Sequence, residues 1–266
     1  MKTKSFIILI ATFIMIFMSS GCIIINTPAD SDALATNTSS PAPLASSAHN
    51  PTAPAASASM PVPPPPTTAP TPTPLAPLTV TDHPTQYANT YISVDIHCPE
   101  ISGMQDAAMQ NGINSGVRDY LQNQSTALEQ QSVLDETNYG AHAAYSYASS
   151  YNVMRNDGHL LSILIAIQSY EGGAHPANTY ATINAQNSNP GDQLTLADLF
   201  VSGTDYVSDI NSEINAAIAA DPTMSGTFWF TTIGAGQTFY LTDTQLVIVF
   251  DPYSIAPGAY GAPMFE

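Results

Sequence analysis

The sequence predicts an α+β protein built from two strand-helix-strand-strand halves, with the helices packed on antiparallel sheet. Stretches that alternate between apolar and polar residues predict half-buried strands, and two stretches with apolar residues at helical spacing predict helices. The order strand, helix, strand, strand occurs in residues 86–170 and again in residues 171–266. We therefore expect two α+β subdomains in these ranges. The pattern leaves open whether the two halves share one sheet.

The first predicted elements are a strand and a helix. Residues 91–98 alternate between apolar and polar, and Pro99, which has no amide proton to donate, is expected to end the strand. Ser102 and Gln105 have the spacing of a capping box, so a helix is predicted over about residues 104–124 and could run on toward Gln131. Its apolar stripe consists of Met109, Ile113, Val117, Tyr120 and Leu121.

A hairpin is predicted next. Strands over residues 142–155 and 159–170 flank the sequence Asn-Asp-Gly at 156–158, which is typical of a tight turn. The second strand is apolar on both faces and is expected at the centre of the sheet. One face of the first strand carries tyrosines, namely Tyr145, Tyr147 and Tyr151. We expect them in the core; the alternative is a platform for sugars or a protein partner.

The second half repeats this order. Thr195 and Asp198 form a second capping-box pattern, which predicts a short helical turn. The other elements are predicted as a strand at 178–186, a helix at about 204–220 ended by Asp-Pro, and two strands near 237–241 and 245–251.

The N-terminus predicts a lipoprotein signal peptide over residues 1–21. Two lysines precede a short apolar run, and small residues lead to Cys22, which would be lipidated and become the new N-terminus. Ser19 stands where lipoproteins usually carry Leu, and residues 6–25 are long enough for an uncleaved membrane helix instead. Both alternatives place the rest of the chain outside the cytoplasm, and the first gives a lipid-anchored protein at the cell membrane.

Residues 22–85 are predicted to be a tether rich in Pro, Ala, Ser and Thr. Residues 28–84 hold 15 of the 22 prolines. A segment of this composition cannot bury enough apolar surface to offset the entropy of ordering, and proline keeps it extended. We expect it to hold the folded part away from the membrane.

Charge excludes one class of function. Loss of the signal peptide would leave Arg118 and Arg155 against 21 carboxylates, a net charge of −19. Nucleic-acid binding is excluded because phosphate contacts need Lys and Arg. The charge is explained either by solubility or by attraction of cationic partners. Cys98 would be the sole thiol, without a disulfide partner. We predict no metal site at His97 and Cys98, since strand alternation places them on opposite faces.

The turn "EGGAH", Glu171 to His175, has three interpretations. A catalytic histidine–carboxylate pair is one, but no nucleophile elbow or His-Glu-x-x-His motif accompanies it. A ligand-contacting loop is the second. In the third, which we expect, Gly172 and Gly173 supply backbone angles that other residues avoid, and His175 anchors the turn by a ring hydrogen bond. We predict no catalytic residue, metal or cofactor, and retain Glu171 and His175 as candidate ligand-binding residues.

A second loop, "DPYSIAPGAYG" at residues 251–261, carries Tyr253 and Tyr260. Loops on a rigid sheet are where binding residues concentrate. Its prolines and glycines also have a structural explanation. We add Tyr253 and Tyr260 to the candidate ligand-binding residues.

These motifs also resemble a known family. The segment "YISVDIHCPEISGMQDAAMQNGINSGVRDYL" resembles the opening strand and helix of the extracellular region of RsiV-type anti-sigma factors. That pair of small domains also precedes the catalytic domain of some peptidoglycan deacetylases. The segments "YEGGAHPANTYATIN", "LTLADLF" and "FYLTDTQLVIVFDPYSIAPGAYG" are similar to later motifs of the family in the same order. The resemblance covers nearly all of residues 88–266.

The resemblance implies a binding module, since the outer domain of RsiV-type proteins binds lysozyme. We expect no sigma-binding segment ahead of the apolar run and no deacetylase domain after residue 266. Family members usually continue a few residues past the position of Phe265.

We therefore expect a non-catalytic, membrane-tethered envelope module that binds a cationic lysozyme-type muramidase or peptidoglycan fragments. The alternative is an accessory domain of cell-wall modification that works with a separate deacetylase or hydrolase. An enzyme in its own right would require turnover of peptidoglycan that His175→Ala abolishes.

Overall fold

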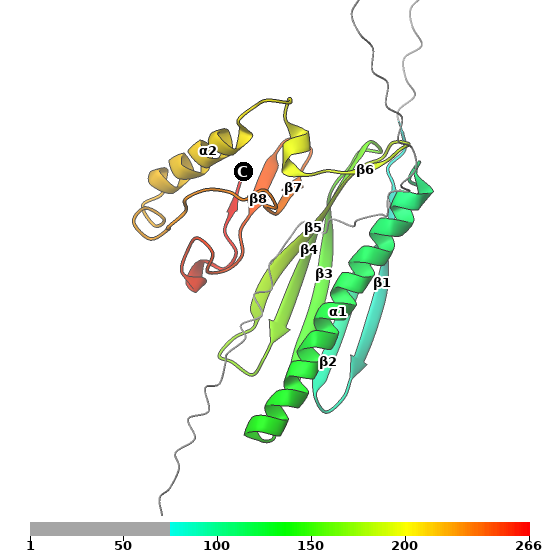
Figure 1. The fold of residues 1–266 in the computed structure, drawn as a ribbon, viewed down its shortest axis with the longest axis vertical. Helices are drawn as coiled ribbons and strands as arrows, with labels where there is room; N and C mark the ends of the chain where they lie inside the picture. Colours follow the sequence, from blue (N-terminus) through cyan, green and yellow to red (C-terminus); the bar gives the residue numbers. More distant parts are fainter. Residues whose placement is uncertain (1–74) are drawn as a thin grey trace, which may run out of the picture. The chain divides into compact units, whose positions relative to one another are not determined.

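Residues 75–266 are described by the computed structural model and form two β-sheets, each packed with one helix (Figure 1). The predicted signal peptide, Cys22 and most of the predicted tether lie outside the described residues. The described part is mixed α and β, as predicted.

The first sheet has six strands in the order β1-β2-β3-β4-β5-β6. They are β1 (Thr79–Ala88), β2 (Ile92–Ser102), β3 (Tyr145–Asn156), β4 (Leu160–Tyr170), β5 (Ala177–Gln186) and β6 (Asp192–Gln193). All neighbours are antiparallel except β2 and β3, which pair in parallel. The antiparallel pairing that we expected therefore has one exception, which arises because helix α1 (Ala107–Tyr139) joins these two strands, and such a crossover allows parallel pairing.

Strand β1 corrects the predicted end of the tether at residue 85. It pairs with β2 along its whole length, and Leu78 just before it is buried. The Leu78 N–H donates to Asn156 Oδ1 at 2.8 Å, and Asn156 Nδ2 donates to the Leu78 carbonyl at 2.7 Å. Pro84 is tolerated because β1 is the edge strand. Composition did not reveal this strand because its side chains are exposed or half-buried.

Two predicted boundaries around α1 were also wrong. Strand β2 does not stop at Pro99 but continues to Ser102. Strand β3 pairs with β2 only as far as Ile96, so Pro99 has a neighbour on one side alone and its missing amide proton is tolerated. The cap of α1 is Asp106, whose side chain accepts hydrogen bonds from the Ala108 and Met109 N–H groups, rather than Ser102 with Gln105.

Helix α1 is longer than its apolar stripe because small polar residues continue its buried face. Beyond Leu121 the buried positions include Ser125 and Ser132. The Ser132 hydroxyl donates to the Tyr91 carbonyl at 2.8 Å. A serine that satisfies its hydroxyl in this way lets the helix lie close to the start of β2.

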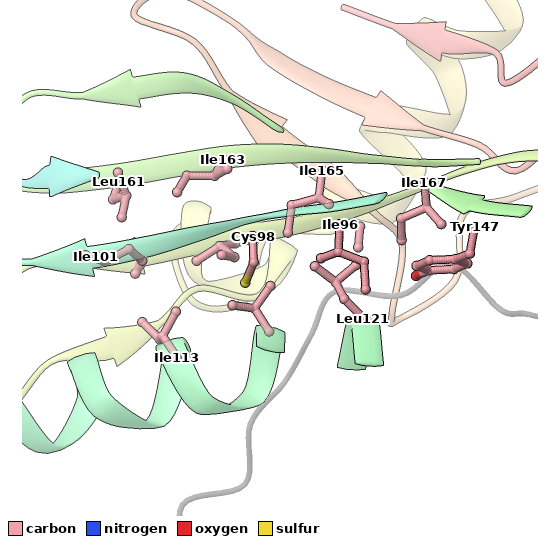
Figure 2. Packing of buried hydrophobic residues seen from close by; sticks show 14 of the residues in the cluster. Ile96, Cys98, Ile101, Ile113, Leu121, Tyr147, Leu161, Ile163, Ile165 and Ile167 are labelled. Carbon is pink, nitrogen blue, oxygen red and sulfur yellow. The ribbon is translucent and has the colours of Figure 1, made fainter. Parts of the chain in front are cut away.

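The first core lies between α1 and the sheet, as Figure 2 shows, with side chains of the strands pointing toward those of the helix. Tyr145 and Tyr147 are buried in this core, as expected, and Tyr151 packs against it. Cys98 is also buried there, and burial raises the pKa of its thiol to about 11. The thiol is therefore protonated at neutral pH and acts as a small apolar side chain.

The second sheet has three antiparallel strands in the order β7-β8-β9. They are β7 (Phe239–Leu241), β8 (Leu246–Val249) and β9 (Met264–Phe265), and they pack with α2 (Tyr206–Ala220) and the short turn η1 (Leu196–Leu199). A second short turn, η2 (Gly258–Tyr260), precedes β9. The Thr195–Asp198 capping box at η1 is present: the Thr195 N–H donates to Asp198 Oδ2 at 2.8 Å.

We predicted a division of the folded part between residues 170 and 171. In the structure this point lies between β4 and β5, which pair over ten residues of the same sheet. The first sheet therefore continues to Gln193, and the residues of the second core begin at Leu196.

A buried hydrogen-bond network joins the two sheets. The Ser162 hydroxyl on β4 donates to Asn184 Oδ1 on β5 at 2.7 Å and accepts from the Leu241 N–H on β7 at 2.9 Å. Asn184 Nδ2 donates to the Phe239 carbonyl at 2.8 Å. Ser162 and Asn184 are 0% and 1% exposed, so no water replaces these bonds.

We predict that Asn184→Ala lowers the free energy of unfolding by about 2–4 kcal/mol, because it leaves the buried Phe239 carbonyl without its donor. Urea denaturation measures the change. Asn178→Ala on the same strand, where the side chain is exposed, serves as the matched control and should cost less than about 0.5 kcal/mol. Equal losses in the two variants would contradict this role for Asn184.

Candidate functional site

The Glu171–His175 turn connects β4 and β5 at the surface. All five residues are exposed, and Gly172 has φ +79°, a region that favours glycine. The His175 ring nitrogen Nδ1 lies 3.1 Å from the Pro176 carbonyl oxygen. The anchoring bond and the backbone of Gly172 are those expected of a structural turn, but Gly173 does not adopt a positive φ, so the prediction for that glycine was wrong.

Acidic and phenolic side chains surround this turn. Within residues 75–266 no three His, Cys, Asp or Glu side chains come together to hold a metal ion. The Glu171 carboxylate lies near Tyr145, whose hydroxyl donates to Asp135 Oδ2 at 2.6 Å. Burial raises the pKa of Tyr145, and the Asp135 and Glu171 carboxylates raise it further. The phenol therefore stays protonated and acts as a donor.

The loop after β8 holds Tyr253 and Tyr260 in place. Tyr253 is 62% exposed and has φ +65°, which is unusual for a bulky residue. Its ring lies over Gly258, where an added Cβ would overlap it. The Tyr260 hydroxyl donates to the Thr223 carbonyl, and the Tyr260 ring packs edge-on against Phe228 at 4.8 Å between centroids. Tyr260 is thus held by two contacts, and Tyr253 is placed by its backbone conformation and by the space that Gly258 leaves for its ring.

Trp229 joins this loop, although we did not single it out from the sequence. Its indole Nε1–H donates to the Ser254 carbonyl and its backbone N–H to the Ile255 carbonyl, both at 2.9 Å. Half of the Trp229 surface is exposed. We call Trp229, Tyr253 and Tyr260 the aromatic cluster. The sequence did offer a signal for Trp229: it is the only tryptophan in the chain, and it stands between two phenylalanines.

The structure does not unite the four candidate residues in one site. No hydrogen bond, ion pair or ring contact in residues 75–266 joins Glu171 or His175 to Tyr253 or Tyr260. The aromatic cluster is the better candidate for binding because its side chains are large, exposed and held in position.

The charge around these residues is dominated by carboxylates. The two arginines of the described part already face carboxylates: Arg155 lies 2.7 Å from Asp157, and Arg118 lies 4.0 Å from Glu100. Partial burial opposes ionisation of Asp157, but hydrogen bonds from backbone N–H groups and from Arg155 outweigh it and lower the pKa to about 2. Residues 75–266 hold 19 carboxylate side chains against these two arginines.

Two histidines supply titratable positive charge. His97 Nδ1 lies 2.7 Å from Asp82 and Nε2 lies 3.5 Å from Asp95. The hydrogen bond and the charge of Asp82 raise the pKa of His97. His142 places Nδ1 2.7 Å from the Ala143 carbonyl and Nε2 3.0 Å from the Ser132 carbonyl, and these acceptors raise its pKa. In each of these two histidines, both ring nitrogens lie near an acceptor. This arrangement favours the protonated imidazolium form, in which both nitrogens are donors.

Residues 85–178 match the family described as deacetylase PdaC, and residues 197–266 match the family described as a protein of unknown function, DUF3298. The anti-sigma-V factor RsiV of Bacillus subtilis is 28% identical over 186 residues, which are 65% of this chain and 61% of RsiV. The resemblance to RsiV-type outer domains is confirmed. At 61% of RsiV, the match spans less than two thirds of the length of that protein.

Two solved structures of DUF3298-family members are similar to this chain. A crystal structure of a DUF3298-family member from Bacteroides fragilis superposes with a TM-score of 0.52 and 17% identity, covering 71% of this chain and 89% of that one. This likeness supports the α+β fold. A DUF3298-family protein from Pseudomonas aeruginosa reaches a TM-score of 0.48 at 20% identity. In the described part of the chain, no helix has the length and apolar character needed to cross a membrane.

The histidine geometry predicts a pH dependence. Because the pKa values of His97 and His142 are raised in the folded state, protonation of these rings stabilises the fold fully below the ordinary histidine value of 6.5. That stabilisation is lost as pH rises through the folded-state pKa values. We expect the melting temperature to fall as pH rises above 6.5.

Asp82→Asn should flatten the part of this dependence that belongs to His97, because it removes the charged acceptor. Asp243→Asn, in an exposed turn, removes the same charge elsewhere and is the control. Thermal melts across pH 6 to 9 measure both variants. Identical pH profiles for Asp82→Asn and the control would exclude the His97–Asp82 contact as the cause.

Proposed function

We propose that residues 75–266 are a non-catalytic binding module of the bacterial envelope, held at the membrane by lipidated Cys22, whose ligand is a cationic lysozyme-type muramidase. The observation that carries the proposal is an exposed aromatic cluster, with Trp229 and Tyr260 tied to backbone carbonyls, on a strongly acidic domain. The similarity to RsiV supports it, and the ligand is the one implied by the family resemblance.

The aromatic cluster has the character of a protein-binding centre. Tryptophan and tyrosine dominate the residues that contribute most to binding, because each buries a large apolar area and keeps a polar group for orientation. Trp229 and Tyr260 are already held by hydrogen bonds, and Tyr253 lies over Gly258. Little side-chain entropy therefore remains to be lost on binding.

The charge of the domain supports a cationic partner. After residue 74 the sequence has no Lys and only two Arg, and both arginines face carboxylates. An acidic surface accelerates the encounter with a basic protein and suppresses binding of acidic ones. This long-range attraction weakens as the Debye length falls from about 30 Å at 0.01 M salt to about 8 Å at 0.15 M.

Peptidoglycan fragments are the other ligand of the same proposal, since aromatic rings also stack on sugars. A separate function is favoured by the match of residues 85–178 to the PdaC deacetylase family. In that alternative the chain is an accessory domain of cell-wall modification. Co-purification from cells with a separate deacetylase or hydrolase, in the absence of lysozyme binding, would favour it.

We predict that purified residues 75–266 bind lysozyme in isothermal titration calorimetry at low salt, more weakly at 0.15 M salt. Trp229→Ala should weaken binding at least about 30-fold, as expected for a central aromatic residue. Tyr139→Ala is the matched control: Tyr139 is 80% exposed at the end of α1, away from the cluster in sequence and contacts, and its loss should leave affinity unchanged.

No binding of lysozyme at low salt would reject this ligand. Equal effects of Trp229→Ala and Tyr139→Ala would reject the aromatic cluster as the binding surface. Binding of soluble peptidoglycan fragments alone, abolished by Trp229→Ala, would identify them as the ligand of the cluster instead.

Gly258 offers a more selective test. In Gly258→Ala the added methyl group would overlap the outer atoms of the Tyr253 ring, so the ring has to take another position. We expect the free energy of unfolding to change by less than about 1 kcal/mol, because the nearest atoms that the methyl group would meet are the outer atoms of an exposed side chain. Lysozyme affinity should fall toward that of Tyr253→Gly. Full affinity with a displaced ring would mean that the position of Tyr253 is unimportant.

A further inference from the structure

An open cavity of about 510 Å³ lies where the start of β4, the end of β5 and η1 meet. This volume is within the range of roughly 300–1,000 Å³ that is usual for small-molecule sites. None of the residues of the aromatic cluster lines it. The cavity is therefore separate from the surface proposed for the protein partner.

One part of the cavity wall is apolar. It is formed by four leucines: Leu75, Leu160, Leu194 and Leu199. They come from the segment before β1, from β4 and from the chain that leads through η1. Leucines of this kind hold methyl groups or other small apolar parts of a ligand.

Another part of the wall is polar and already built. Asn187 is 4% exposed, and its side chain is satisfied on both ends: Nδ2 donates to the Gly158 carbonyl at 2.8 Å, and Oδ1 accepts from the Gln105 N–H at 2.8 Å. The Gln105 amide Nε2 donates to the Asn187 carbonyl at 2.9 Å. The wall is thus held in shape without a ligand.

Three side chains at the rim remain available. Gln186, Asn189 and His159 line the cavity and are exposed, and their side chains make no hydrogen bond or ion pair with other residues of 75–266. Each carboxamide offers both donors and an acceptor. The one carboxylate of the lining, Asp198, is already bonded to Thr195, and no Lys or Arg lines the cavity. An anionic ligand would therefore find no fixed positive charge.

We infer that this cavity binds a small neutral ligand that carries an acetamido group, on either a sugar or an acetylated peptide. The leucines would take the methyl group, and the free carboxamides of Gln186 and Asn189 would pair with the amide of the ligand. A carboxamide pairs with a secondary amide through one donor and one acceptor. A hydroxyl group does not present a donor and an acceptor in that same geometry.

The test is a titration of isotope-labelled residues 75–266, which hold both hydrophobic cores, followed by amide and side-chain NMR shifts. The probes are N,N′-diacetylchitobiose, N-acetyl-alanine amide and, as a disaccharide without acetamido groups, cellobiose. We expect at least one acetamido probe to shift the Gln186 and Asn189 side-chain signals with a Kd on the order of millimolar, and cellobiose not to.

Gln186→Ala should weaken this binding by about 3-fold to 10-fold, the effect of one lost hydrogen bond. Gln168→Ala on β4, whose side chain bonds Asn178 outside the cavity, is the control and should bind as the parent does. The acetamido probe that binds decides between a sugar and a peptide source.

Three outcomes would overturn the inference: no site-specific shifts with either acetamido probe, equal binding of cellobiose, or shifts confined to the loop of Tyr253. None of them affects the proposed binding of lysozyme, because that proposal depends on different residues.

Discussion

The buried hydrogen bonds among Ser162, Asn184 and the backbone of β7 are the constraint on which the rest of the structure depends. Each sheet packs with its own helix and would bury its own core, and these bonds connect the backbone of the second sheet to buried side chains of the first. Apolar residues around them complete the junction, namely Leu164, Tyr240, Val247 and Val249. A satisfied polar network in an apolar setting specifies one arrangement, since any shift would leave buried groups unpaired.

Ion pairs contribute little to the stability of this domain. Its arginines make two surface contacts, of the kind that contribute little to stability, and most carboxylates have no fixed cation nearby. The fold is therefore held by its cores and buried hydrogen bonds, while the charge remains on the surface and can act on partners. The histidines that face carboxylates or carbonyls, His97 and His142, relieve part of the repulsion when they are protonated.

The aromatic cluster, a candidate binding surface, contains one residue in an unfavourable backbone conformation and two residues held by hydrogen bonds. Tyr253 adopts a backbone conformation that is unfavourable for its type, and the glycine at 258 leaves room for its ring. Trp229 and Tyr260 are tied to neighbouring carbonyls. Residues held in unusual conformations concentrate at functional sites, and this site presents three large rings without requiring them to be ordered on binding.

The sequence by itself determined the type and order of most elements, the tyrosines of the core, the turn at Gly172 and the RsiV-type resemblance. These depend on short-range periodicity, on turn chemistry and on ordered motifs, which are all readable along the chain. It also singled out Tyr253 and Tyr260, because they stand in a loop rich in Pro and Gly. It did not determine whether Glu171 and His175 belong to the same site.

Only the tertiary structure decided the rest. The edge strand β1, the parallel pairing of β2 with β3 and the placement of β5 in the first sheet all depend on which distant segment each strand meets. Trp229 became part of the aromatic cluster only because its indole reaches the Ser254 carbonyl, 25 residues away in sequence. The local pattern of a segment determines its preference for helix or strand. Pairing partners, caps and cavities depend on contacts between distant segments, and the periodicity within one segment does not predict those contacts.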